Sequence, residues 1–178
     1  MKKTVALVVI DGFGVTEKIE GDATKVAKMP YYNNLVKNYP HCLLRASGEF
    51  VGLKKGQMGN SETGHLNIGA GRIVKQDLTI IDDAISSGEF YKNKELCKIM
   101  EITKNNYSDL HIMGLTSNGG IHSHIDHLFA TLRLAKKYDL KNVYIHCFTD
   151  GRDTSPTSAV NFVKEIEHEC KKIGVGEI

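Results

Sequence analysis

Strand-like and helix-like segments alternate along the chain, which leaves few folds open to it. Apolar runs predict strands over residues 4–10, 42–46, 110–115 and 143–148. Helical spacing predicts helices over residues 30–39, 76–87, 96–102, 125–138 and 157–173. Alternation of this kind is typical of an α/β fold, in which right-handed crossovers join the strands of a parallel sheet.

The texture of the sequence changes near residues 72–77, where a glycine-rich segment gives way to steady alternation of strands and helices. The length of 178 residues allows one ordinary domain or parts of two. We therefore expect two structural units, residues 1–76 and residues 77–178.

Charge and composition exclude several classes of function. With 41% hydrophobic and 25% charged residues, the chain has the composition of a soluble globular protein. A net charge of +2 without a block of Lys or Arg points to neither nucleic acid nor an acidic membrane as partner. The apolar run at residues 4–10 is too short to span a bilayer and lacks a cleavage site. Four scattered cysteines without a CxxC pair favour reduced thiols, and we expect a cytoplasmic protein.

Polar clusters follow three of the predicted strands and begin at Asp11, at His122 and at Asp150. In open α/β sheets, ligands bind at the carboxyl ends of strands. Asp11, in the string VVIDGFG, ends the first predicted strand and precedes Gly12. A carboxylate there either holds a divalent cation on a stiff support or caps the Asp-Gly turn, and the local sequence leaves both readings open.

The string QMGNSETGHLNIGAGR, residues 57–72, has no apolar stripe that could anchor a core helix. Its glycines let a ligand approach the backbone closely. Ser61 stands where a helix is expected to begin, and there the N–H groups and the helix dipole favour an anion. Ser61 is therefore either a helix cap or a nucleophile activated by a base or a metal. Neither a GxSxG elbow nor a GxxxxGK(S/T) loop occurs in this string, so neither an α/β-hydrolase nor a nucleotide-binding loop is indicated.

The string GGIHSHIDHL matches the HxHxDH spacing of metallo-β-lactamase-type hydrolases, which bind zinc. The residues of this pattern are His122, His124, Asp126 and His127. Against a zinc site, the helix expected from residue 125 would turn Asp126 and His127 away from the loop, and the histidines downstream are isolated. His122 precedes that helix and is the residue that we expect in a functional site.

The string FTDGRDTSP, residues 148–156, follows the last predicted strand. Arg152 offers a fork of donors that suits a phosphate or a carboxylate. Asp153 can accept a proton or hold a substrate hydroxyl. The Asp150-Gly151 pair is also a common turn, and an Asp-Arg-Asp run is often an ion-paired loop, so both readings stay open.

Four strings occur in order along the chain: VVIDGFG, GNSETGHLNIGAGR, SNGGIHSHIDHL and FTDGRDTSP. Together they resemble the cofactor-independent (2,3-bisphosphoglycerate-independent) phosphoglycerate mutases, a family of the alkaline phosphatase superfamily. The resemblance runs the length of the chain, with minor departures such as Thr149. It implies an alkaline-phosphatase-like parallel-sheet domain, of which residues 1–76 are the amino-terminal part. Residues 77–178 would be the first part of an inserted α/β phosphotransferase domain.

The resemblance also implies an activity and roles for particular residues. Members of the family interconvert 3-phosphoglycerate and 2-phosphoglycerate in glycolysis and gluconeogenesis, through a phosphoserine and with two manganese ions. By position, Ser61 would be the nucleophile and, with Asp11, a ligand of one manganese. His122, Arg152 and Asp153 would bind the small-molecule substrate, and Asp153 would also accept a proton.

Members of the family are far longer than this chain, and the remainder supplies most of the manganese ligands. We therefore expect an incomplete enzyme that neither binds its metals tightly nor turns over substrate alone, and a complete enzyme that is a monomer. Two alternatives explain less of the sequence pattern. One is a non-catalytic module that binds phospho-acids, and the other is the zinc hydrolase suggested by HxHxDH.

Overall fold

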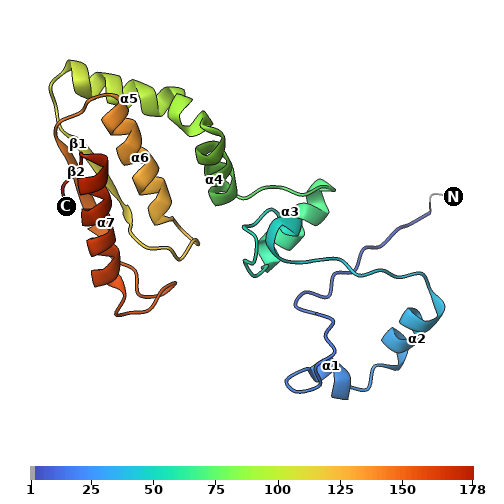
Figure 1. The fold of residues 1–178 in the computed structure, drawn as a ribbon. Coiled ribbons are helices and arrows are strands. Elements are labelled where there is room, and N and C mark those ends of the chain that lie inside the picture. Colours follow the sequence, from blue (N-terminus) through green and yellow to red (C-terminus); the bar gives the residue numbers. More distant parts are fainter. Residues whose placement is uncertain (1–2) are drawn as a thin grey trace. The chain divides into compact units, whose positions relative to one another are not determined.

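A computed structural model describes residues 3–178 of the chain (Figure 1). The chain forms two compact units, unit 1 (Met1–Val74) and unit 2 (Lys75–Ile178). The point of division lies within residues 72–77, where the sequence changes in texture. No helix in the described part of the chain is both long enough and apolar enough to cross a membrane.

Unit 2 alternates helices and strands. Its elements are α4 (Asp77–Ser87), the 3-10 helix η2 (Glu89–Lys92), α5 (Lys94–Asn105), β1 (Leu110–Leu115), α6 (Ile125–Lys137), β2 (Val143–Phe148) and α7 (Ala159–Ile173). Both strands begin and end at the residues predicted from the sequence. The α-helices of this unit lie within three residues of their predicted bounds.

The two strands of unit 2 form a small parallel sheet. Their register runs from Leu110 opposite Val143 to Leu115 opposite Phe148. Parallel neighbours need a crossover between them, and α6 is the helix that supplies it. The expectation of a mixed α/β architecture with a parallel sheet is thereby confirmed for this unit.

The core of unit 2 lies on one face of the sheet, against α5, α6 and α7 (Figure 1). Side chains alternate between the two faces of a strand. Val143 and Ile145 of β2 are accordingly buried, whereas His146, the next residue after Ile145, points to the opposite face and is exposed. Leu132 of α6 and Ile166 of α7 are fully buried. Burying a side chain of this size contributes about 1.5–3 kcal/mol, so the packing gives firm support to the loops that follow the strands.

The helices of unit 2 begin and end at residues suited to those positions. Gly88 ends α4 and Gly174 ends α7, both with positive φ, 82° and 79°, which glycine adopts without steric cost. The side chain of Asn93 accepts hydrogen bonds from the N–H groups of Glu95 and Leu96 and so caps α5. The sequence thus fixes where each of these helices stops or starts.

Unit 1 holds short helices joined by long segments without regular structure. Its elements are α1 (Ala23–Val26), α2 (Pro30–Asn38), the 3-10 helix η1 (Gly48–Val51) and α3 (Ser61–Ala70). As predicted, α2 begins at Pro30, because proline fits the first helical turn, where an N–H would have no partner within the helix. The buried residues among those described in unit 1 are Gly48, Val51, Gly52, Leu53 and Thr63. The described part of this unit therefore has no extended apolar core.

Two strands predicted in unit 1 are wrong. Residues 4–10 and 42–46 lie in no helix or strand. Their apolar side chains stay in solvent, with Val5 91% exposed and Leu44 87% exposed. A strand forms only when its N–H and C=O groups pair with another strand. The described residues of unit 1 give these two runs no such neighbour, so their β propensity alone does not make a sheet.

Candidate active site

Ser61 is the first residue of α3 in unit 1, as the sequence predicted. The residue that caps this helix is its neighbour Asn60, whose Oδ1 accepts the N–H of Thr63 at 2.9 Å. The reading of Ser61 as the cap is therefore wrong. Its hydroxyl is free of that structural task and lies in solvent at the positive end of the helix.

The hydroxyl of Ser61 lies beside the carboxylate of Asp11. Ser61 Oγ donates a hydrogen bond to Asp11 Oδ2 at 2.7 Å, across 50 positions of sequence. Both side chains are exposed. The Asp-Gly turn is also present, since Gly12 has φ of 74° and Phe13 N donates to Ile10 O at 3.3 Å. Backbone atoms close that turn, so the carboxylate of Asp11 is left to accept the hydrogen bond from Ser61.

A histidine that the sequence analysis did not single out completes this cluster. His65 Nδ1 lies 3.2 Å from Ser61 Oγ and 2.9 Å from the carbonyl oxygen of Ser61. The signal that could have found it is its position four residues after Ser61, because residues at this spacing lie on one face of a helix. We define the site cluster as Asp11, Ser61 and His65.

Gly59, just before α3, and Asn67, within it, hold this helix against the neighbouring backbone. A Cβ added at Gly59 would lie 1.7 Å from the carbonyl oxygen of Ala46, so only glycine fits there. Asn67 donates to the carbonyl oxygens of Val51 and Thr63 at 3.0 and 2.7 Å. It also accepts the N–H of Val74 at 2.6 Å. These contacts position the helix that carries Ser61.

The oxygens of Asp11 and Ser61 are suitable ligands for a divalent cation. Manganese and similar hard cations take about six ligands, mostly oxygen, and a carboxylate is preferred among them. Asp11 Oδ2 and Ser61 Oγ are exposed and 2.7 Å apart, so they fit two positions of such a ligand set. Within residues 3–178, no three His, Cys, Asp or Glu side chains gather as a complete metal site would require.

In unit 2, the loop after β2 is organised by the buried carboxylate of Asp150. Its Oδ1 accepts the N–H groups of Gly151, Arg152 and Asp153 at 2.7, 2.9 and 3.1 Å. Its Oδ2 accepts the hydroxyl of Ser117 at 2.8 Å. The backbone hydrogen bond from Arg152, and after it the bond from Ser117, hold the pKa of Asp150 well below its ordinary value. The turn reading is confirmed for Asp150, which thereby fixes the two residues that follow Gly151.

The loop after β1 meets this loop at the carboxyl ends of the two strands. His122 Nε2 lies 3.9 Å from Asp153 Oδ2, with 73% of the His122 side chain exposed and 18% of that of Asp153. A Cβ added at Gly119 would lie 2.9 Å from the Cβ of Asp153, so the loops approach closely. Arg152 is exposed beside them. The structure therefore brings three predicted site residues to one edge of the sheet, as expected of strand ends.

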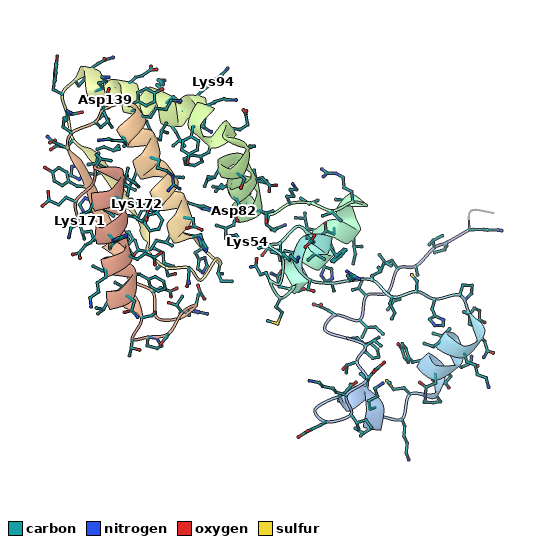
Figure 2. All side chains as sticks on the ribbon, viewed as in Figure 1. Lys54, Asp82, Lys94, Asp139, Lys171 and Lys172 are labelled. Atoms are coloured by element: carbon teal, nitrogen blue, oxygen red, sulfur yellow. The ribbon has the colours of Figure 1, made fainter. Side chains whose placement is uncertain are left out.

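The histidines of the HxHxDH string take separate partners. His124 Nδ1 accepts the N–H of Asp126 at 3.3 Å and caps α6. His127 Nε2 contacts Asp82 Oδ1 on α4 at 2.7 Å, and Figure 2 labels Asp82 on that helix. His122 faces Asp153 instead. This is the divergence that the predicted helix implied, and the arrangement gives no support to a zinc hydrolase.

Comparison with known proteins agrees with these observations. The family model described as BPG-independent PGAM N-terminus (iPGM_N) matches residues 81–178. The 2,3-bisphosphoglycerate-independent phosphoglycerate mutase of Clostridium botulinum is 55% identical over 177 residues, which cover 99% of this chain and 35% of the relative. The protein of the same name from Clostridioides difficile is 53% identical, with 99% of this chain and 34% of the relative covered.

A solved structure is similar to this chain as well. It is the phosphoglycerate mutase of Leishmania mexicana at low cobalt concentration, which is 34% identical with a TM-score of 0.72. The match covers 96% of this chain and 32% of that one, so the chain spans about a third of the length of these relatives. Since the family model covers more than half of the chain, the chain belongs to the BPG-independent PGAM N-terminus family.

Proposed function

We propose that this chain is the amino-terminal part of a cofactor-independent phosphoglycerate mutase. The enzyme would interconvert 3-phosphoglycerate and 2-phosphoglycerate through a phosphoserine at Ser61, with Mn²⁺ and without bisphosphoglycerate. The observation that carries the proposal is the 2.7 Å contact of Ser61 Oγ with Asp11 Oδ2 at the first residue of α3. Family membership and the names of the relatives support it.

The proposal includes the domain plan implied by the sequence. Residues 1–76 would be the amino-terminal part of an alkaline-phosphatase-like metal-binding domain. Residues 77–178 would be the first part of an inserted phosphotransferase domain, and the parallel sheet of unit 2 is compatible with this assignment. The complete enzyme would be a cytoplasmic monomer that acts in glycolysis and gluconeogenesis.

The surroundings of Ser61 suit a hydroxyl that accepts a phosphoryl group. The N–H groups at the start of α3 and the helix dipole attract the negative charge of a phosphate. Asp11 accepts the hydroxyl hydrogen and so orients a lone pair of Ser61 Oγ away from the carboxylate. Both residues are exposed, which leaves room for a substrate.

Asp11 and Ser61 would also be the residues of this chain that hold one of two Mn²⁺ ions. When bound, a divalent cation lowers the pKa of a hydroxyl that it contacts and offsets the charge of a phosphate. The two oxygens fit this role by their type and their separation. The remaining ligands would come from the part of the enzyme that the relatives contain in addition.

The transfer needs two displacements at phosphorus. In the first, Ser61 Oγ loses its hydrogen to solvent and bonds to phosphorus while the bond to the 3-oxygen of glycerate breaks, and Asp153 gives that oxygen a proton. In the second, the 2-hydroxyl of glycerate attacks the phosphoserine, gives its proton to Asp153 and releases Ser61 Oγ, which takes a hydrogen back from solvent. The proton and the electron pairs balance over the cycle, and the protein contributes chiefly placement and charge.

The loops of unit 2 would bind the glycerate. The guanidinium of Arg152 matches a carboxylate or a phosphate in shape and charge. The network around Asp150 fixes the backbone from which Arg152 and Asp153 project. His122, 3.9 Å from Asp153, would donate to the substrate beside that carboxylate.

A chimera tests this function. Residues 1–178 of this chain are joined to the part of the Clostridium botulinum relative that lies beyond its 177 matched residues. With Mn²⁺ and 3-phosphoglycerate but no bisphosphoglycerate, the chimera should form 2-phosphoglycerate, whereas the 178-residue chain alone should not. A folded chimera without turnover, assayed beside the intact relative as positive control, would contradict the proposal.

A further inference from the structure

The imidazole of His65 has no role in the function proposed above, although it touches the oxygen that would accept the phosphoryl group. Its Nδ1 lies 3.2 Å from Ser61 Oγ and 2.9 Å from the Ser61 carbonyl oxygen. His65 is exposed and stands one helical turn after Ser61 on α3. Two short contacts from one nitrogen to the same residue call for an explanation.

The hydrogen-bond partners assign the tautomer of His65. The carbonyl oxygen of Ser61 can only accept a hydrogen bond. The hydroxyl of Ser61 gives its single hydrogen to Asp11 Oδ2, so its oxygen can only accept from His65 as well. Nδ1 therefore faces two acceptors and must carry a hydrogen, which leaves Nε2 of the neutral ring without one.

We propose that His65 is a catalytic residue whose Nδ1–H donates to Ser61 Oγ and stabilises the negative charge that this oxygen carries during phosphoryl transfer. This inference rests on the proposed function, because it assigns a second group to the same nucleophile. In the resting structure the hydrogen is shared between the carbonyl oxygen and Oγ. When charge develops on Oγ, the bond to Oγ becomes charge-assisted and the share moves toward it.

The same bond would act in both displacements. Ser61 Oγ is the attacking atom when the phosphoserine forms and the leaving atom when it breaks. It becomes negatively charged when it loses its hydrogen before the attack and again as it leaves. A fixed N–H aimed at such an oxygen works in the manner of an oxyanion hole. Loss of one such donor costs about 100-fold to 1,000-fold in rate at enclosed sites. At this exposed position we expect a loss of about 10-fold to 100-fold.

A purely structural role for His65 predicts a different order of variants. The amide nitrogen of Asn reaches the position of Nδ1, whereas the longer Gln places its amide near the position of Nε2. Gln is the better residue for a helix interior, and Asn is the poorer one. If His65 only supports α3, His65→Gln should be the milder change. If the Nδ1–H donor matters, His65→Asn should be the milder change despite its lower helix propensity.

Nitrogen-correlated NMR of the unaltered 178-residue chain reads the tautomer directly. We expect His65 as the Nδ1–H form, and a shift of the Nδ1 signal in the Ser61→Ala chain, which lacks one of the two acceptors. The Nε2–H form in the unaltered chain would overturn the inference. This measurement needs neither metal nor substrate.

The rate measurement uses the chimera described above and its variants His65→Asn, His65→Gln and His65→Ala. We expect phosphoserine formation to fall about 10-fold to 100-fold in His65→Ala and His65→Gln, with much of the rate kept by His65→Asn. A His65→Gln chimera as fast as, or faster than, His65→Asn would overturn the inference. If the unaltered chimera forms no phosphoserine, the proposed function fails, and the tautomer experiment still decides the hydrogen bond.

Discussion

Units 1 and 2 differ in how many of their backbone and apolar groups find partners within the same unit. In unit 2 two strands pair, and helices bury Leu132 and Ile166 against them. In unit 1 the most β-prone run, residues 4–10, stays in solvent, and the described residues make no strand. The candidate nucleophile Ser61 nevertheless belongs to unit 1. The candidate nucleophile therefore lies in one unit, and the extended apolar core lies in the other.

This difference separates structure that local sequence signals can form, such as a helix start, from structure that needs distant partners, such as a sheet. A helix start such as that of α3 needs only local signals, so Ser61 finds its place with a cap and a few side-chain hydrogen bonds. A sheet needs distant partners, and the chain spans only about a third of the length of its relatives. Local chemistry can thus be arranged in a unit whose packing is incomplete.

The largest expected effect concerns the nucleophile in unit 1. Ser61→Ala in the chimera should lower mutase turnover by about 10⁴-fold or more, because the covalent step loses its acceptor oxygen. The control is Ser86→Ala, which removes an exposed hydroxyl from α4 and should leave turnover unchanged. Turnover of Ser61→Ala within 10-fold of the unaltered chimera would contradict the assignment.

The next effect tests the contrast in packing. Leu132→Ala in α6 should lower the free energy of unfolding of unit 2 by about 2–5 kcal/mol, because it leaves a cavity in the core. Val8→Ala in unit 1 removes apolar atoms from a side chain that is 79% exposed and should change stability by less than about 0.5 kcal/mol. Urea unfolding followed by circular dichroism measures both. Equal losses of stability would show that apolar side chains in the two units contribute equally, against the contrast in packing described above.

A smaller effect concerns the contact between α4 and α6 within unit 2. His127 and Asp82 are only 15% and 29% exposed, and their contact is 2.7 Å long. A double-mutant cycle with His127→Ala and Asp82→Ala at pH 7 should give a coupling energy of about 1 kcal/mol. The exposed pair Lys75 and Asp83, 60% and 53% exposed, is the matched control and should couple by less than about 0.5 kcal/mol. Coupling as weak as in the control pair would show that the contact of His127 with Asp82 does not stabilise the packing of α4 against α6.

The last effect concerns the loop that carries Arg152 and Asp153. The folded-state pKa of Asp150 is depressed, so the carboxylate stabilises unit 2 above its ordinary pKa, and this contribution is lost as pH falls through the folded value. The stability difference between the unaltered chain and Asp150→Asn should be constant from pH 7 to 5 and shrink below about pH 4. Urea titrations at several pH values measure it. A stability difference that grows as the pH falls would contradict a depressed pKa of Asp150 in the folded state.

Sequence reasoning succeeded where the deciding signals were local. The strands β1 and β2 were predicted to the residue, because each is an apolar run bounded by polar loops. The start of α3 at Ser61 was predicted from the residue types after Asn60. Residues 4–10 form an equally clear apolar run, yet they make no strand, because a strand depends on partners that the pattern of the sequence does not supply.

The candidate site was predicted in part, for the same reason. Asp11 and Ser61 were both chosen from the sequence, but their contact joins residues 50 positions apart and needed the structure. The pairing of His127 with Asp82 and the burial of Asp150 are long-range facts of this kind. His65 differs, because its spacing from Ser61 was visible and its meaning was missed.

Rapid-quench mass spectrometry of the chimera gives the most direct test of the account. After milliseconds with 3-phosphoglycerate and Mn²⁺, the peptide that contains residues 57–72 should carry one added phosphoryl group, and fragmentation should place it on Ser61. The signal should be absent from the Ser61→Ala chimera. A chimera that turns over normally while the phosphoryl group is found on another residue, or on none, would contradict the central claim.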